Sequence, residues 1–152
     1  MGSKVETVPQ VADPTEGTVV FLIGMRVNKW WLLHRWIPAF YSMIPMLIEL
    51  NKNKETTGFL SHQTWFGRTV IVVQYWRSMG ELLTYARNND HMHHPQWRKF
   101  NRYVNNNGSV GIYHEAYEIV PSRIHTVYRN MPPFGLGKAT AVRPQRPLAF
   151  TL

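Results

Sequence analysis

Apolar and polar positions alternate along several stretches of the chain, a pattern typical of β-strands. The stretch GTVVFLIGMRV, residues 17–27, is apolar on both alternating faces and predicts a central strand covered on two sides. GFLSHQTWF and RTVIVVQYW alternate on either side of Phe66, Gly67 and Arg68, so they predict a tight antiparallel hairpin. SVGIYHEAYEIV, residues 109–120, predicts a further strand, and IHTVYRN, residues 124–130, a short one.

Helical spacing appears between these strands. Asn28 is a candidate cap for a helix that opens with KWWLLHRW, and Pro38 predicts that this helix is kinked or restarted. The side chains expected to face the core repeat at helical spacing, and Phe40 and Leu47 widen the stripe formed by Ile37, Tyr41, Ile44 and Ile48. Trp30, Trp31 and Trp36 are expected to pack against the sheet or a second subunit, with ligand stacking as the alternative.

Two more helices are predicted in the second half of the chain. Ser78 and Glu81 form an S-x-x-E capping box, which predicts a helix start. The apolar face of that helix is expected to hold Met79, Leu82, Leu83 and Ala86. Pro95 suits the first turn of a following helix, whose apolar face is expected to hold Trp97, Phe100 and Val104.

The resulting order, βαββα(α)β with a terminal strand, predicts an α+β ferredoxin-like sandwich. Residues 1–16 are polar, contain two prolines and are expected to form a flexible arm. The ferredoxin-like domain is then expected over residues 17–130. Residues 131–152 are rich in Pro and Gly and predict a tail extended over the body or a neighbouring subunit.

Composition narrows the function classes. The 152 residues suit a single domain, and the absence of cysteine excludes disulfides, thiolate nucleophiles and iron–sulfur clusters. The net charge of +8 raises a nucleic-acid interpretation, but the basic residues are scattered, and RTVIVVQYW places aliphatic residues where RNA-recognition modules carry stacking rings. No nucleic-acid partner is therefore expected. The apolar stretch from Trp36 to Ile48 is too short for a transmembrane segment, and the lack of a signal sequence indicates a cytoplasmic location.

Five motifs carry a family resemblance: GTVVFLIGMRVN, VVQYWRSMGELLTYAR, WRKFNR, VGIYHEAYEI and VYRNMPPFGLGKAT. Over roughly residues 17–140 the chain resembles the DUF4188 family, also called monooxygenase af470-like, a branch of the dimeric α/β-barrel superfamily. The resemblance implies a homodimer in which two sheets form a barrel and each subunit holds a pocket between sheet and helices. It also implies a small monooxygenase-like enzyme of secondary metabolism that acts on a hydrophobic small organic molecule.

Oxygenation without a cofactor requires a base, a dry pocket and donors for an oxyanion. His114 is the first candidate base, beside Glu115, although neighbouring residues on a strand face opposite sides and cannot form a simple dyad. A histidine that only packs in the strand is the alternative. Arg26, Asn28, Tyr75 and Tyr113 are candidates to hold an anionic or carbonyl oxygen, and simple core packing is the alternative for both tyrosines. The predicted catalytic set is His114, Glu115, Arg26 and Tyr75, and the predicted substrate-binding set is Asn28, Trp76, Trp97, Tyr113 and Tyr128.

Two alternatives use the same pocket. A haem-binding protein or haem enzyme of this fold would need an axial ligand, and the resemblance directs attention to the cluster of His91, His93 and His94. Solvated turn histidines are the other interpretation of that cluster. A lyase, isomerase or cyclase would instead use His114 or Glu115 for proton transfer. The monooxygenase-like interpretation requires no cofactor or metal.

Overall fold

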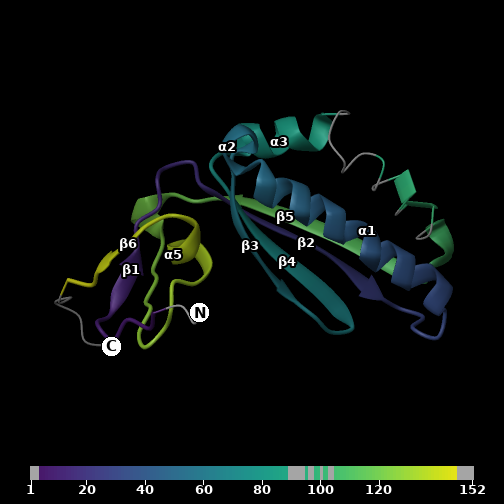
Figure 1. The fold of residues 1–152 in the computed structure, drawn as a ribbon, viewed down its shortest axis with the longest axis horizontal. Helices are drawn as coiled ribbons and strands as arrows, with labels where there is room; N and C mark the ends of the chain where they lie inside the picture. The colour runs from purple at the N-terminus through teal and green to yellow at the C-terminus, as the bar shows by residue number, and fades with distance from the viewer. Residues whose placement is uncertain (1–3, 89–94, 96–97, 100, 103–104, 147–152) are drawn as a thin grey trace.

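The fold is built on a four-stranded antiparallel sheet. The structure is a computed structural model that describes residues 4–88, 95, 98–99, 101–102 and 105–146. The strand order is β3-β4-β2-β5, seen edge-on in Figure 1. The strands are β2 (Val19–Val27), β3 (Phe59–Trp65), β4 (Thr69–Trp76) and β5 (Val110–Glu118). β2 pairs with β4 on one side and with β5 on the other, which confirms the predicted central strand.

The helices α1 (Leu33–Lys52) and α3 (Met79–Arg87) cover one face of this sheet. Val19, Phe59 and Trp76 of the sheet pack with Leu50 of α1 and Leu82 of α3. A second cluster joins Met25, Val27 and Val70 to the first half of α1. The short α2 (Lys54–Thr57) leads into β3 through Gly58 in the left-handed conformation. This arrangement confirms the predicted α+β ferredoxin-like class.

Helix α1 differs from the sequence prediction in its start. The backbone N–H groups of Asn28 and Lys29 both donate to the carbonyl oxygen of Ser109, at 2.9 and 3.2 Å. Residues 28–29 therefore extend the pairing with the β5 side, and the helix begins only at Leu33. It then runs through Pro38 and Pro45 as one assigned helix rather than restarting, although each proline removes a helical hydrogen bond.

The predicted core face of α1 is wrong at three positions, although Phe40 packs against the core as expected. Tyr41, Ile44 and Ile48 are exposed to solvent, whereas Ala39, Ser42 and Leu50 are buried. Trp36, Phe40 and Met43 pack against the sheet beside Ala39. The helix carries apolar residues on two sides, and contact with the sheet selects one of them.

Helix α3 begins at the predicted cap. The Glu81 N–H donates to Ser78 Oγ at 3.2 Å, and that hydroxyl donates to Glu81 Oε2 at 3.1 Å. The buried face of the helix consists of Leu82 and Tyr85, with Met79 partly buried; Leu83 and Ala86 are exposed, contrary to prediction. The Tyr85 hydroxyl reaches Glu49 Oε2 of α1 at 3.3 Å and ties the two helices together.

The two ends of the described chain pair with each other. β1 (Gln10–Ala12) and β6 (Val142–Pro144) form a two-stranded antiparallel sheet, and α5 (Gly135–Ala139) lies beside it, at the left of Figure 1. Segments expected to form an arm and a tail thus share a small module, while the domain limits themselves stay predictions. In the expected strand 124–130 the structure shows only an isolated bridge at Tyr128, with a second at Met131 just beyond it, both to the N-terminal segment.

The module covers one end of the other sheet face, which we call the open face. There Val20 and Val73 of the sheet pack with Ala12, Tyr75, Leu136 and other apolar residues. On the two edge strands of the open face, Glu115 and Tyr117 of β5 and Trp65 of β3 are exposed. Short 3-10 turns, η1 (Asn105–Asn107) and η2 (Pro121–Arg123), precede and follow β5. Residues 95, 98–99 and 101–102 are helical, while Trp97, Phe100 and Val104 lie outside the described residues.

Candidate functional site

A cavity of about 670 Å³ lies between the sheet and the first half of α1. Its floor is aliphatic and comes from the strands: Met25, Val27 and Val70. Its walls are aromatic and come from the β2–α1 connection, from α1 and from the β3–β4 turn: Trp30, Trp31, Trp36, Phe40 and Phe66. The volume lies inside the range of about 300–1,000 Å³ that small-molecule sites occupy.

Strand register explains why these segments meet. Arg26 pairs with Thr69, so the chain after β2 and the chain before β4 emerge at the same end of the sheet. The Val27 N–H donates to the Arg68 carbonyl at 2.9 Å and holds the two segments together. Any antiparallel pairing of these strands at this register brings residues 28–31 beside residues 66–68.

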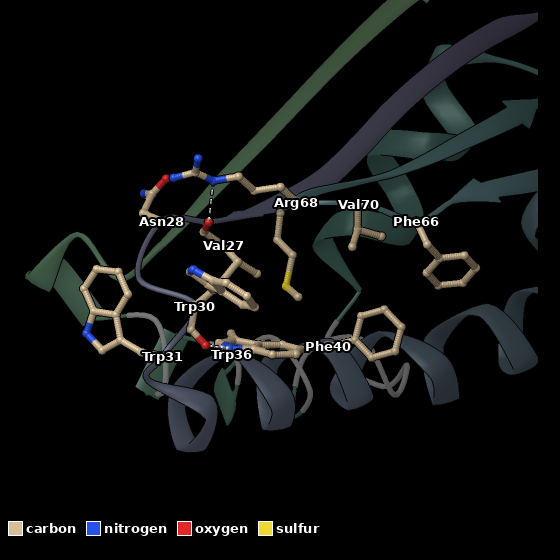
Figure 2. Close-up of a pocket in the computed structure, with 11 residues that line it drawn as sticks. Val27, Asn28, Trp30, Trp31, Trp36, Phe40, Phe66, Arg68 and Val70 are labelled. Atoms are coloured by element: carbon tan, nitrogen blue, oxygen red, sulfur yellow. Dashed lines mark hydrogen bonds between the residues drawn. The ribbon is translucent and has the colours of Figure 1, made fainter.

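Among the described residues that line the cavity, two have polar side chains, Asn28 and Arg68. The Arg68 Nε–H donates to the Val27 carbonyl at 3.3 Å, which directs the side chain across the end of β2. In Figure 2 the side chains of Arg68 and Asn28 lie at the sheet side of the cavity, and Trp36 and Phe40 at the helix side. The cavity therefore offers an apolar bed with a guanidinium and an amide at one edge.

The aromatic wall is anchored at two points. The Trp36 Nε1–H donates to the Trp30 carbonyl at 2.9 Å, which fixes the β2–α1 connection over the first turn of the helix. The rings of Phe40 and Phe66 lie 5.8 Å apart, which ties α1 to the β3–β4 turn. Trp30 and Phe66 are nevertheless 68% and 72% exposed, so the mouth of the cavity opens to the surface.

Of the residues predicted from the sequence, Asn28 lines this cavity. His114 and Trp76 lie on the same helix-covered face but elsewhere. The exposed imidazole of His114 packs near the ring of Phe21, with centroids 6.1 Å apart. Trp76 is buried against Phe59 at 5.4 Å and donates from Nε1 to Gln74 Oε1 at 3.0 Å, so it is a core residue.

Three predicted residues lie on the open face: Arg26, Tyr113 and Glu115. Arg26 and Glu115 are exposed, and Glu115 Oε2 accepts a hydrogen bond from the Tyr117 hydroxyl at 2.9 Å. Burial, and secondarily the Glu115 carboxylate, raises the pKa of Tyr113. The sheet separates this group from His114, as the strand alternation predicted.

Tyr75 and Tyr128 form a third group, beneath α5. Both belong to the apolar cluster at the covered end of the open face. Burial, and secondarily Tyr128, raises the pKa of Tyr75. The Tyr128 hydroxyl accepts from the Gly137 N–H at 3.1 Å and holds α5 in place.

The remaining candidates, Trp97 and the three histidines His91, His93 and His94, lie outside the described residues. Among the residues that the structure does describe, no group of three or more His, Asp or Glu side chains is placed to hold a metal ion. The predicted catalytic and binding roles stay predictions.

Sequence reasoning missed Arg68 and Phe66 as cavity residues, because both were assigned to a turn. It recognised the cluster of Trp30, Trp31 and Trp36 but favoured packing for it. The signal that could have found the site is the pairing of β2 with β4, which places both turns at one end of the sheet.

Comparison with solved structures shows the same fold at low sequence identity. An aldoxime dehydratase, crystallised with butyraldoxime, superposes with a TM-score of 0.69 at 14% identity over 92% of this chain, which spans 42% of that enzyme. SnoaB, a cofactor-independent oxygenase from Streptomyces nogalater, superposes with a TM-score of 0.50 at 9% identity. The match covers 70% of this chain and 95% of the SnoaB chain.

A protein from Caulobacter crescentus CB15 assigned to the antibiotic-biosynthesis monooxygenases gives a TM-score of 0.53 at 11% identity, over 69% of this chain and 92% of its own. A search of curated proteins found no significant match. The family comparison is more specific: the monooxygenase af470-like family matches residues 18–136, most of the chain. The protein belongs to the monooxygenase af470-like family.

Proposed function

We propose that this protein is a monooxygenase-like enzyme that binds a hydrophobic small organic molecule in the cavity between the sheet and α1. The observation that carries the proposal is the cavity itself. Five aromatic side chains form its walls, aliphatic side chains form its floor, and two polar side chains lie at one edge. Flat apolar molecules fit such walls because ring faces stack well against them. Family membership and the fold of SnoaB support the enzyme class.

The chemistry that this site suits best is stabilisation of an anion. A guanidinium keeps its proton in proteins, so Arg68 supplies positive charge and donors rather than acting as a base. Apolar walls exclude water around the guanidinium and so strengthen its attraction for a bound anion. An enol or phenol bound with its oxygen at Arg68 and Asn28 would lose its proton more readily, and the proton would leave to solvent through the open mouth.

The resulting enolate or phenolate is electron-rich enough to reduce dioxygen directly. In the balanced overall step, a methylene carbon of the substrate is oxidised to a carbonyl. It takes one oxygen atom from O₂, and its two hydrogens leave with the other oxygen as water. The described lining residues then have to bind and orient the substrate and stabilise its negative charge. His114 stays a predicted base that lies outside this cavity lining.

Proton-transfer chemistry without oxygen finds less support in the cavity. A lyase or isomerase needs a positioned acid or base. Among the described residues that line the cavity there is no His, Asp, Glu, Lys or Tyr. For haem, those same residues offer no axial imidazole. Haem binding through His91, His93 or His94 remains the alternative, and a Soret band after haem addition would identify it.

A matched pair of fluorescent probes tests the site. 1-Anilinonaphthalene-8-sulfonate is an apolar anion, and N-phenyl-1-naphthylamine has the same rings without the sulfonate. We expect Arg68→Met to weaken binding of the anion by roughly tenfold, as for a partly exposed charge-assisted contact, and to leave the neutral probe unchanged. Arg68→Lys should retain most of the anion affinity. If Arg68→Met lost affinity equally for both probes, or kept its affinity for both, the role given to Arg68 would be contradicted.

Turnover is tested with an oxygen electrode and a panel of hydroxylated aromatics and enolisable ketones. We expect oxygen uptake without added metal, flavin or haem, and its loss in Arg68→Met. Arg87→Met, at an exposed position on α3, is the matched control. Isomerised or dehydrated product formed without oxygen uptake would assign the cavity to the non-redox class.

We also propose that two copies pair their open faces to form an α/β barrel. Trp65 and Tyr117 are 44% and 53% exposed on that face, so the small β1–β6 module leaves the two edge strands partly uncovered. Light scattering should then give twice the chain mass. Trp65→Ser combined with Tyr117→Ser should shift the mass toward the monomer, whereas Leu83→Ser on α3 should not. A wild-type monomer at micromolar concentration would refute the pairing.

A further inference from the structure

Exposed apolar side chains run from the cavity mouth along the outer side of α1. On the helix, Leu33, Tyr41, Ile44 and Ile48 are exposed at spacings of eight, three and four residues, so they form one stripe. Ring contacts of 5.8 Å from Phe40 to both Tyr41 and Phe66 join this stripe to the mouth. We call the whole the docking surface: Trp30, Trp31, Leu33, Tyr41, Ile44, Ile48 and Phe66.

The charged residues at the cavity-mouth end of this surface are basic. The other exposed residues of α1 are His34, Asn51 and Lys52, and none is acidic. At the mouth, Lys29 and Arg68 are exposed beside Trp30 and Phe66. In the sequence there is no Asp or Glu between Glu16 and Glu49, or between Glu55 and Glu81. Among the described residues, basic groups border the apolar and aromatic side chains at the cavity mouth, whereas the far end of α1 carries Lys52 near the half-buried Glu49 and the exposed Glu55.

This combination favours an anionic lipid surface over a second copy of the chain. In a two-fold self-pairing the same patch meets itself, so Lys29, Lys52 and Arg68 would approach equally basic rims. An anionic membrane instead offers negative potential outside and apolar depth inside, and Trp and Tyr side chains concentrate at that boundary. None of the described helices is long and apolar enough to cross a bilayer, so contact would be within the interface.

We propose that the docking surface binds the headgroup region of an anionic lipid bilayer, with the cavity mouth against the membrane. Trp30, Trp31 and Phe66 then enter the interface, and α1 lies along it. The proposed membrane binding depends only on the residues of the docking surface. A second consequence rests on the proposed function: an apolar substrate dissolved in the bilayer can enter the cavity without crossing water.

Vesicle flotation tests the binding with the intact chain. The probe is a phosphatidylcholine vesicle with or without about one-fifth phosphatidylserine, a negative surface of physiological strength. We expect the protein to float with the anionic vesicles. Ile44→Ser combined with Ile48→Ser should weaken this binding roughly tenfold or more, because it removes apolar area that the lipid would cover. Neither isoleucine lines the cavity, so binding of N-phenyl-1-naphthylamine should stay unchanged.

A charge variant separates the two contributions. Lys29→Gln combined with Lys52→Gln should weaken binding to anionic vesicles by roughly fivefold for each lysine and leave neutral vesicles unaffected. The matched control is Leu83→Ser combined with Val127→Ser, which removes two exposed apolar side chains elsewhere and should change nothing.

No flotation with anionic vesicles, or equal loss in the control and the isoleucine variant, would overturn the proposal. So would an isoleucine variant that changes the molecular mass but not vesicle binding, because the surface would then be an interface between copies. Absence of oxygen uptake in the parent chain, with vesicle binding intact, would reject the proposed function and leave the docking in place.

Discussion

Two glycines on adjacent strands should respond to the same substitution with opposite signs. Gly24 lies in the middle of β2, opposite Ile71 on β4 and Tyr113 on β5. Gly111 lies on β5, opposite Arg26. An alanine methyl at Gly24 would overlap the carbonyl oxygen of Val70 and lie 2.9 Å from Tyr113 Cε1. At Gly111 its nearest neighbour would be Asn28 Nδ2 at 3.7 Å, an ordinary contact.

The magnitudes decide the signs. Replacing glycine by alanine stabilises a protein by about 0.4–1 kcal/mol where the backbone conformation suits both residues, because the unfolded chain loses freedom. Overpacking costs about 1–3 kcal/mol, and the upper end applies at Gly24 because the atom overlapped belongs to the backbone of β4, which cannot turn aside. We therefore expect Gly24→Ala to lower the free energy of unfolding by about 2 kcal/mol and Gly111→Ala to raise it by about 0.5 kcal/mol.

Urea unfolding followed by tryptophan fluorescence measures both variants against the parent chain. The midpoint should fall for Gly24→Ala and stay or rise for Gly111→Ala, with unchanged slopes. A Gly24→Ala midpoint at or above that of the parent would show that β2 and β4 do not approach as closely as the register implies.

Three further changes test the helix cap, one histidine and the cavity wall. Ser78→Ala removes the hydroxyl that caps α3 and should cost about 1 kcal/mol of unfolding free energy, with exposed Ser122→Ala as the control in the same urea assay. Burial, then Lys54 and Lys138, lowers the pKa of His62, so the folded protein binds that proton less readily than the unfolded chain. Stability should therefore rise with pH from the lowered folded value up to about 6.5, and urea midpoints of His62→Gln should lack this rise. Trp36→Phe removes the hydrogen bond from the indole N–H to the Trp30 carbonyl and should weaken N-phenyl-1-naphthylamine binding roughly two- to fivefold. The far-ultraviolet circular dichroism spectrum should stay unchanged.

Local signals in the sequence predicted the framework of this protein. The central strand, the hairpin around Gly67 and the Ser78 cap all depend on neighbouring residues, and the structure contains all three. The pairing of β1 with β6 had no such signal, because each strand has three residues and they lie at opposite ends of the chain. Ala12 of β1 packs in the apolar cluster around Tyr75, a tertiary contact that the local sequence does not indicate.

The face of α1 illustrates a second limit. Periodicity identifies an apolar stripe, but this helix has two, and the sequence favoured the one through Tyr41 and Ile48. The sheet instead selects the side with Trp36, Ala39 and Leu50, because the small Ala39 side chain lets the helix approach closely. The choice between two apolar stripes is made by the partner surface rather than by the helix.

Candidate residues were chosen from the sequence by chemical type, and the fold distributes the described ones over four places: the cavity, the rest of the helix-covered face, the open face and the cluster beneath α5. His114 and Glu115 are neighbours in the chain but lie on opposite sheet faces, whereas Asn28 and Arg68 are distant in the chain and line one cavity. The residues that form the cavity lie in the connections after β2 and before β4. Their proximity depends on strand pairing, which no single segment encodes.

The distribution of acidic residues connects the cavity with the surface around it. Because the chain has no Asp or Glu between Glu16 and Glu49 or between Glu55 and Glu81, the connections that form the cavity carry Lys29 and Arg68 without neutralising partners in those same segments. Uncompensated charge at an apolar mouth attracts anions over about one Debye length, about 10 Å at moderate salt. Both an anionic substrate and an anionic lipid surface would then approach the same end of the molecule. Their binding should weaken together as salt increases, whereas binding of a neutral probe inside the cavity should not, because apolar contact does not depend on the screened field.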